Sequence, residues 1–344
     1  MYKKVLVIKL GSAVITNSAG NINKAVVKKI SEDISRLSKQ YKIVLVSSGA
    51  VSSGKKYLKD YKGTLLQRKV AAAIGNPILI QLYRSYFHKH GLTVAQALCE
   101  RGHFSNRKQF LQLKETFTTF WGNNIIPVVN ENDVISNMEL KFSDNDELAT
   151  LIAIGFDAET LILCTSVGGL LDASKNIIPE VTAINKETLA LVSNEKSDTG
   201  LGGMLSKLTF TRLATSLGIR VIMCGLQGKT PFTDALENKT GTHFPSQNST
   251  LKNRQKWLAS GSITLGNIYV DKGACKALTD RKSLLTVGIT QVDGSFAAGE
   301  VVQIMNEENH IVGVAKTKLS ASELRKKLKE KNVMAAHAND IVLL

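Results

Sequence analysis

The stretch KKVLVIKLGS, residues 3–12, and the segments that follow it predict the fold. The apolar residues Val5 to Ile8 predict a buried strand that runs into a glycine-serine turn. Residues 23–40 then carry apolar side chains at helical spacing, and residues 43–48 form a second apolar run. This order predicts a helix between two buried strands.

The same alternation continues over the first two thirds of the chain. We predict further strands at 93–98, 125–130, 160–165 and 220–224, and helices at 66–89, 105–121, 146–155 and 204–217. Buried strands that alternate with helices are typical of an α/β fold with a mostly parallel sheet sandwiched by helices. Ligands of such sheets bind beyond the carboxyl ends of the strands, so we expect the functional motifs there.

The pattern changes after Phe244. Residues 246–256 are polar without periodicity and are predicted to form a linker. Short strand-like runs follow, separated by glycine-containing turns, at 262–270, 284–292, 301–306 and 311–317. We therefore expect an α/β domain over residues 1–245 and a small β-rich domain over residues 257–344.

Length and composition set outer limits. The chain has 344 residues, 43% of them hydrophobic, which fits about two domains and excludes disorder as the main state. Apolar runs are much shorter than the roughly 20 residues of a membrane span, and Lys9 interrupts the run after the basic N-terminus. We expect no membrane span or signal peptide. The four cysteines form no C-x-x-C pair, which argues against a zinc or redox motif and fits a reducing cytoplasm.

Charge is unevenly distributed. The formal net charge is +15, and residues 1–100 alone carry 17 Lys and Arg against 4 Asp and Glu. Residues 101–200 instead carry 8 against 14. A basic surface can steer anionic substrates such as nucleotides, although a solvated helix face would look the same. The acidic middle third suits cations better.

Two motifs at predicted strand ends suit an anion. In Lys9-Leu10-Gly11-Ser12 the glycine lets a phosphate approach the backbone, and the lysine adds positive charge. In Ser47-Ser48-Gly49-Ala50 small residues offer amide and hydroxyl donors. Either motif alone could also be an ordinary turn.

Two further motifs complete the set. Asn130-Glu131-Asn132-Asp133, with Ser143 to Glu147, fits a cation, an amino group or bound magnesium, and Ser143 or Asp144 also suits a helix N-cap. Gly200 to Lys207 is a glycine-rich loop that opens a helix, where backbone amides bind phosphate. It lacks the G-K-[ST] ending of a P-loop.

The order of these motifs resembles the amino-acid kinase family over essentially the whole chain, and the C-terminal region resembles the PUA domain appended to some members. The resemblance implies the amino-acid kinase fold and places the chain in the branch that phosphorylates the γ-carboxylate of L-glutamate. The product would be L-glutamyl 5-phosphate, the first intermediate of proline biosynthesis. It also implies ATP and Mg²⁺ as cofactors, and the cysteine pattern above predicts a cytoplasmic enzyme.

The resemblance assigns roles to individual residues. Lys9 and Lys207 would neutralise the transferring phosphoryl group, and Asp146 would orient both lysines. Substrate binding falls to Ser48, Gly49, Ala50, Asp133 and Asn145, with Asp133 placed to take the ammonium group. Nucleotide binding falls to Lys9, Gly11, Thr165, Ser166, Leu201, Gly202, Gly203, Met204, Leu205, Ser206 and Lys207. It assigns no metal ligand among the side chains.

Two positions depart from the family pattern, both on the nucleotide side. Ser166 stands where the family usually has aspartate, and Leu201 stands where its glycine-rich loop usually has threonine. These departures bear on nucleotide affinity or preference, because the lysines and the acidic cluster are intact.

The resemblance also implies partners: a homo-oligomer (dimer or tetramer), L-proline as feedback inhibitor, and a glutamyl-phosphate reductase as the next enzyme. Two alternatives stay open. One is a kinase of the same fold acting on another carboxylate or amino acid. The other is a catalytically impaired homologue with an RNA-binding or regulatory role through the PUA-like domain. Against RNA binding, residues 251–344 carry only 14 Lys and Arg against 9 Asp and Glu.

Overall fold

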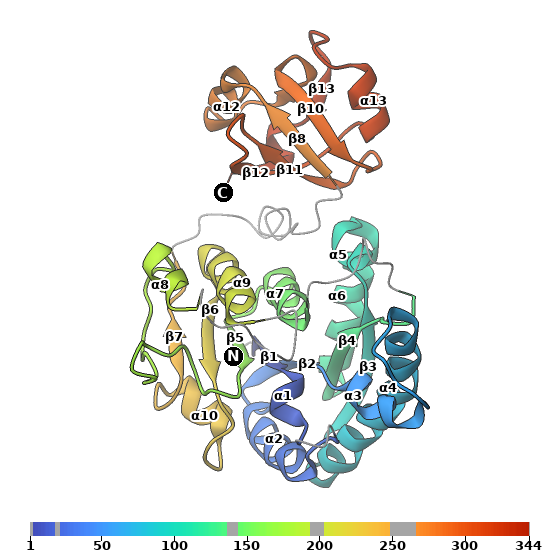
Figure 1. The fold of residues 1–344 in the computed structure, drawn as a ribbon, viewed down its shortest axis with the longest axis vertical. Coiled ribbons are helices and arrows are strands. Elements are labelled where there is room, and N and C mark those ends of the chain that lie inside the picture. Colours follow the sequence, from blue (N-terminus) through green and yellow to red (C-terminus); the bar gives the residue numbers. More distant parts are fainter. Residues whose placement is uncertain (1–2, 18–20, 136–143, 193–202, 248–265, 344) are drawn as a thin grey trace. The chain divides into compact units, whose positions relative to one another are not determined.

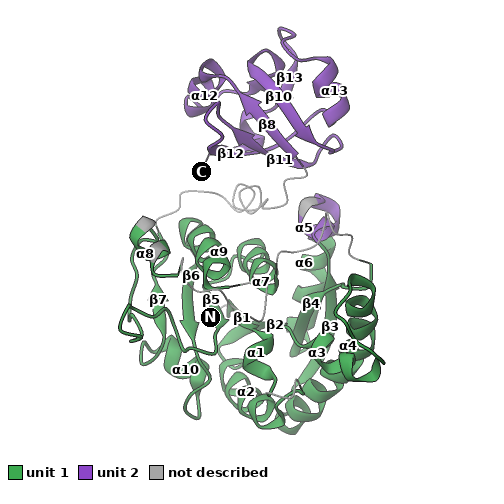
Figure 2. Cartoon of the chain, in the orientation of Figure 1, with its two compact units in different colours: residues 1–100, 111–249 green, residues 101–110, 250–344 purple. Residues whose placement is uncertain are grey.

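The protein consists of two compact units, shown in different colours in Figure 2. The computed structural model describes residues 3–17, 21–135, 144–192, 203–247 and 266–343. The first unit comprises Met1–Glu100 with Leu111–Ser249, and the second comprises Arg101–Phe110 with Thr250–Leu344. The predicted linker over 246–256 falls mostly outside the described residues.

A seven-stranded sheet forms the centre of the first unit, with the strand order β3-β4-β2-β1-β5-β6-β7 (Figure 1). Every neighbouring pair is parallel except β6 and β7, which are antiparallel. The prediction of a mostly parallel sheet is therefore confirmed. The strands are β1 Lys4–Leu10, β2 Tyr41–Ser47, β3 Thr93–Cys99, β4 Ile125–Glu131, β5 Thr160–Cys164, β6 Arg220–Cys224 and β7 Thr242–Phe244.

Helices cover the sheet. Five of them agree with the predicted segments to within a few residues, whereas the helix Pro231–Leu236 and the shorter helices were not predicted. The main helices are α2 Lys24–Leu37, α4 Leu65–Phe87, α6 Arg107–Gly122, α7 Asn145–Gly155, α9 Met204–Ser216 and α10 Pro231–Leu236. Shorter helices are α1 Ser12–Ile15, α3 Ala50–Gly54 and α8 Lys186–Ala190, whereas α5 Gly102–Ser105 belongs to the second unit. No helix in the described part of the chain is long and apolar enough to cross a membrane.

The two faces of β1 divide its side chains between two helix layers. Leu6, Ile8 and Leu10 enter a core with α2, α4 and α10. Successive side chains of a strand point to opposite faces, so Lys9 lies on the face opposite Leu10. Helix α7 packs against β1, β2, β4 and β5. The alternation along one strand thus places a lysine under α7.

The second unit has a core of its own. Its five-stranded sheet has the order β10-β8-β11-β12-β14, and β13 pairs with β9 in a separate ribbon. The elements are β8 Gly266–Val270, α12 Lys272–Thr279, β9 Leu284–Leu285, β10 Ile289–Gly294, β11 Val301–Met305, β12 Ile311–Lys316, α13 Ala321–Lys326, β13 Met334–Ala336 and β14 Ile341–Leu343. The prediction of a β-rich C-terminal region is confirmed.

One predicted strand of this unit is wrong. The apolar run 284–292 is not continuous, because a 3-10 turn over Thr286–Gly288 separates β9 from β10. The hydroxyl of Thr286 donates to the carbonyl of Glu330 at 2.9 Å. This buried threonine anchors the turn to a distant segment, a contact that local apolar pattern does not report.

Candidate functional site

The carboxyl ends of the central strands carry the polar residues of the site. Leu10 of β1 is in register with Ser47 of β2 and with Cys164 of β5, so these strands end at one level. Thr165 follows β5, and its amide donates to the carbonyl of Cys224 at the end of β6. The parallel register therefore gathers motifs that are more than a hundred residues apart in the sequence.

Asp146 lies between two lysines at this edge. Its Oδ1 is 2.6 Å from the Nζ of Lys9, and its Oδ2 is 2.7 Å from the Nζ of Lys207. Asp146 is 1% exposed and Lys9 is 5% exposed. Lys9 comes from β1, Asp146 from the first turn of α7 and Lys207 from the first turn of α9. The structure thus brings together the three residues that the sequence analysis named for the reaction.

The electrostatics of this group favour an anion. Burial alone would raise the pKa of Asp146, but attraction to the ammonium groups of Lys9 and Lys207 outweighs burial and holds the pKa below its usual value. The carboxylate is therefore ionised. Two ammonium groups against one carboxylate leave an excess positive charge, which a phosphoryl group can neutralise.

Asp144 joins the starts of the two helices that carry these charges. Its Oδ1 accepts hydrogen bonds from the amides of Asp146 and Glu147, at 2.8 and 3.1 Å, and so caps α7. Its Oδ2 accepts a hydrogen bond of 2.7 Å from the hydroxyl of Ser206 on α9. The sequence predicted the cap but not this second bond, which fixes the starts of α7 and α9 relative to each other.

An amide network occupies the other side of the site. The Nδ2 of Asn145 donates to the hydroxyl of Ser48 at 2.9 Å and to the Oδ1 of Asn130 at 3.0 Å. The Nδ2 of Asn130 donates in turn to the Oδ1 of Asn76, at 3.1 Å. Sequence reasoning missed Asn76, which is buried in α4. A lone amide in the apolar stretch of that helix is the signal that could have found it.

Gly49 shapes the turn between β2 and α3. Its φ is +104°, and a Cβ built there would lie 2.9 Å from the Cδ1 of Ile15. Glycine is therefore needed for both backbone conformation and space. The amide of Ser48 donates to the carbonyl of Leu10 at 3.0 Å, which ties this turn to the end of β1. Ala50, the first residue of α3, is buried.

Gly11 is different. Its φ is −71°, and a Cβ there would meet neighbours only at ordinary contact distances, one of them the Nζ of Lys9 at 3.7 Å. The fold by itself does not require glycine at this position. A ligand that approaches the backbone next to Lys9 would require glycine there, because a side chain would block its approach.

The remaining predicted residues are distributed around the same edge. Asp133 is half-buried in the turn after β4, Thr165 is buried and Ser166 is exposed. Gly203 is the N-cap of α9, and Met204 to Lys207 form its first turn, where Leu205 is exposed. Leu201 and Gly202 lie outside the described residues.

Comparisons with known proteins agree with this architecture. The sequence profile of the amino acid kinase family matches residues 4–225, and that of the PUA domain matches residues 266–337. A carbamate kinase from Giardia lamblia, solved with AMP-PNP bound, shares the fold of the first unit. Its TM-score is 0.53 at 18% identity, over 71% of this chain and 99% of that chain.

Curated relatives match over nearly the whole length. The glutamate 5-kinase of Aquifex aeolicus (strain VF5) is 38% identical, over 93% of this chain and 91% of its own. That of Thermotoga maritima is 34% identical, over 93% and 90%. That of Vibrio vulnificus (strain YJ016) is 32% identical, over 98% and 91%. With both domain profiles in the expected order, the chain belongs to the amino acid kinase family, in its glutamate 5-kinase group with a C-terminal PUA domain.

Proposed function

We propose that this protein transfers the γ-phosphoryl group of ATP to the γ-carboxylate of L-glutamate, with L-glutamyl 5-phosphate and ADP as products. This reaction is the first step of proline biosynthesis. The observation that carries the proposal is the group Lys9–Asp146–Lys207, in which Lys9 and Asp146 are buried and Lys207 is partly buried, and which holds an excess positive charge where the strands end. Phosphoryl transfer needs little covalent help from a protein and depends on positioning and on charge stabilisation.

In this reaction a carboxylate oxygen of glutamate attacks the γ-phosphorus, and the bond to the ADP oxygen breaks. Both reactants are anions, so their approach needs positive charge. Lys9 and Lys207 supply it from two different elements and stabilise the charge on the transferring group. Asp146 is a positioning residue, because each of its oxygens holds one lysine.

The substrate side of the proposal uses the amide network. Asn145 is held by Ser48 and Asn130, so its side chain is preorganised beside the Gly49 turn. We assign glutamate to Ser48, Gly49, Ala50, Asp133 and Asn145, with the carboxylate of Asp133 as acceptor for the substrate ammonium. The nucleotide is assigned to Gly11, Thr165, Ser166, Leu201, Gly202 and Gly203 to Lys207.

Mg²⁺ enters this proposal with ATP rather than as a resident metal. Both oxygens of Asp146 already face lysines, and the described residues include no cluster of three His, Cys, Asp or Glu side chains that could hold a metal. Mg²⁺ commonly reaches such enzymes on the phosphates of the nucleotide. When bound there, it would shield the phosphate charge.

One assay tests the reaction and the substrate together. Purified protein is incubated with ATP, Mg²⁺ and L-glutamate, and hydroxylamine traps the acyl phosphate as a hydroxamate while ADP is measured. D-glutamate, L-aspartate and N-acetylglutamate are the comparison substrates. We expect hydroxamate with L-glutamate alone. Hydroxamate with one of the others instead would identify a kinase of the same fold for another substrate, and turnover with none would reject the kinase proposal.

The remaining expectations extend this proposal. They are a cytoplasmic enzyme, a dimer or tetramer, feedback inhibition by L-proline and delivery of the acyl phosphate to a glutamyl-phosphate reductase. The match of a PUA profile to residues 266–337 supports RNA as a secondary candidate partner. Binding of a labelled RNA over a salt series tests that candidate, because phosphate contacts make affinity fall steeply with salt.

A further inference from the structure

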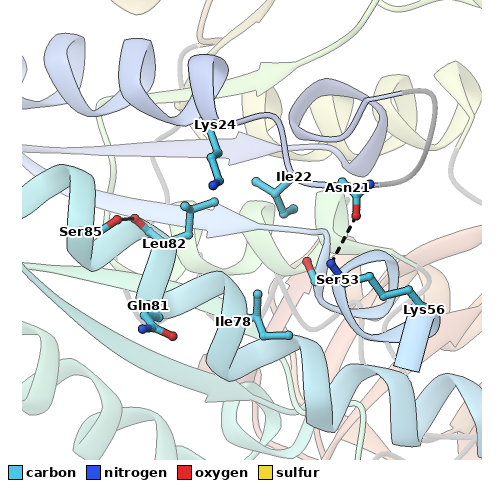
Figure 3. A pocket seen from close by; sticks show the side chains of 9 residues that line it. All are labelled: Asn21, Ile22, Lys24, Ser53, Lys56, Ile78, Gln81, Leu82 and Ser85. Atoms are coloured by element: carbon cyan, nitrogen blue, oxygen red, sulfur yellow. Dashed lines mark hydrogen bonds between the residues drawn. The ribbon is translucent and has the colours of Figure 1, made fainter. Parts of the chain in front are cut away.

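A cavity lies in the first unit, and its lining does not include Lys9, Asp146 or Lys207. It has a volume of about 590 Å³ and lies between the start of α2, the end of α3 with the 3-10 turn Lys55–Tyr57, and the second half of α4 (Figure 3). It shares no lining residue with the site described above. Its size is that of a small-molecule pocket.

The lining of this cavity combines apolar surface with positive charge. Ile22, Ile78 and Leu82 form its apolar part, and Lys24 and Lys56 supply two ammonium groups. None of the lining residues is acidic. Lys56 is 3.5 Å from the Oδ1 of Asn21, and Lys24 has no ion pair with any described residue.

This chemistry selects an anion with an apolar body. Two lysines attract a carboxylate or phosphate, and the isoleucine and leucine side chains bury hydrocarbon or an aromatic ring. A zwitterionic amino acid fits less well, because the lining offers no carboxylate for its ammonium group. The cavity therefore differs in preference from the proposed glutamate site, where Asp133 is the acceptor.

The wall of the cavity contacts the Gly49 turn directly. The hydroxyl of Ser53 donates to the carbonyl of Gly49 at 2.8 Å. The Cδ1 of Ile22 lies 3.1 Å from the place where a Cβ of Gly49 would be. Figure 3 shows Ile22 between Lys24 and Ser53. A molecule that displaces Ile22 or Ser53 thus acts on the residues next to Ser48.

The packing of α3 limits how that displacement can be absorbed. A Cβ on Gly54 would lie 1.9 Å from the carbonyl oxygen of Ala71, and one on Gly75 would lie 1.8 Å from that of Ala50. Helices α3 and α4 are therefore in backbone contact, so α3 cannot move closer to α4. A shift of the cavity wall therefore cannot be absorbed by closer packing of α3 on α4, and the wall's other contact is with the Gly49 turn.

We propose that this cavity is an effector site for a small anion with an apolar body, and that its occupancy changes the affinity of the enzyme for its amino-acid substrate. The binding part is independent of the proposed function, and the coupling part rests on it. By linkage, the substrate must change the affinity for the effector by the same factor.

Binding is tested by calorimetry on the full chain with octanoate and octyl phosphate as probes. Octanamide and octylammonium have the same tail without the negative charge. We expect binding of at least one anionic probe and none of the uncharged or cationic ones. Binding of all four alike, or of none, would overturn the proposal.

The variants locate that binding. In Lys24→Gln with Lys56→Gln we expect affinity for the anionic probe to fall by roughly tenfold or more, since contacts to a charged group are lost. The matched control is Lys39→Gln with Lys62→Gln, which removes equal charge outside the cavity. Gln81→Trp places an indole in the cavity and should also weaken binding. If affinity is unchanged both in the Lys24→Gln, Lys56→Gln double variant and in Gln81→Trp, the probe binds elsewhere and the proposed site is rejected.

Coupling is tested in the hydroxamate assay at saturating probe. We expect the KM for glutamate to change in the wild type and to stay constant in Lys24→Gln with Lys56→Gln. A KM that does not respond, with binding already shown by calorimetry, would reject the coupling and leave the binding site in place. Absence of turnover would reject the kinase function without touching the calorimetric result.

Discussion

Asp146 carries one negative charge and contacts two lysines, so its group has an excess positive charge. Removal of one lysine and removal of Asp146 should therefore affect stability differently. If Lys207 is removed, Asp146 still pairs with Lys9, and the buried charge is balanced. If Asp146 is removed, the buried ammonium of Lys9 and the partly buried ammonium of Lys207 lose their shared counter-charge. The roles of these residues can therefore be separated by combining activity with stability.

Lys207→Ala should abolish most turnover and leave the fold intact. Loss of one charge on the transferring group is expected to lower kcat by about a hundredfold or more. The free energy of unfolding should change little, because the neutral pair Lys9–Asp146 remains. Hydroxamate formation and urea unfolding measure the two quantities. Activity within a few-fold of wild type would remove Lys207 from the reaction.

Asp146→Asn should lower both activity and stability. We expect the free energy of unfolding to fall by about 3–5 kcal/mol, because the amide leaves the buried ammonium of Lys9 and the partly buried ammonium of Lys207 uncompensated. The control is Glu159→Gln, which breaks the exposed pair with Lys4 and should change the free energy of unfolding far less, because solvent screens an exposed pair. An equal loss of unfolding free energy in the two variants would show that the pairing of Asp146 stabilises the fold no more than an exposed ion pair does.

The pH dependence of stability gives a second test of the same carboxylate. The pKa of Asp146 is lowered in the folded state, so its contribution is complete above its unfolded pKa of roughly 4 and is lost as pH falls towards the lower folded value. The stability difference between wild type and Asp146→Asn should therefore shrink as pH falls below about 4. Urea unfolding at a series of pH values measures it. A difference that grows on acidification would contradict the assignment.

At the scale of elements, the turn from β2 into α3 and the paired starts of α7 and α9 determine the site. The turn depends on a positive φ at Gly49, and the paired helix starts depend on Asp144, which bonds both α7 and Ser206. Neither element is long, so each is held by a few specific contacts rather than by its own helical propensity.

Gly49→Ala should strain the turn and weaken glutamate binding. The methyl group meets Ile15 in a backbone conformation that disfavours side chains, so we expect a loss of about 1–3 kcal/mol in stability together with a higher KM for glutamate. Gly91→Ala is the matched control, because Gly91 also has a positive φ but has nothing within 4 Å of its Cβ position. It should cost less stability and leave KM unchanged. A raised KM in both variants would argue against a local effect.

At the scale of the whole molecule, the described residues of the proposed kinase site all belong to the first unit, and the second unit has a separate core. Separate cores predict that damage to the second leaves the first able to act.

Ile304→Asp tests this division. It buries an unpaired carboxylate in the core of the second unit, so hydrogen exchange there should accelerate while hydroxamate formation stays within a few-fold of wild type. Gln303→Asp, on the half-exposed neighbour in β11, is the control and should change neither. Loss of activity with Ile304→Asp alone would show that the kinase site depends on the second unit.

Secondary-structure elements were predicted better from the sequence than the contacts between them. Apolar runs and helical spacing predicted the α/β architecture of the first unit, because those patterns reflect burial of each element. The predicted strand 284–292 was wrong, because a 3-10 turn over Thr286–Gly288 divides the run into two strands, and the Thr286 hydroxyl anchors this turn to the carbonyl of Glu330. Leu201 and Gly202, predicted for the nucleotide, lie outside the described residues.

The sequence by itself determined which residue types stand at the strand and helix ends, and the order of motifs that places the chain in its family. The family resemblance had already linked Asp146 to both lysines. Only the tertiary structure decided that the carboxylate contacts both ammonium groups directly from a buried position, that Asn76 completes the network of Asn145, and that Ile22 and Ser53 connect a cavity to the Gly49 turn. The physical reason is that pattern records the burial of one element at a time. Contacts between side chains distant in the sequence follow from strand register and helix packing, which no local pattern contains.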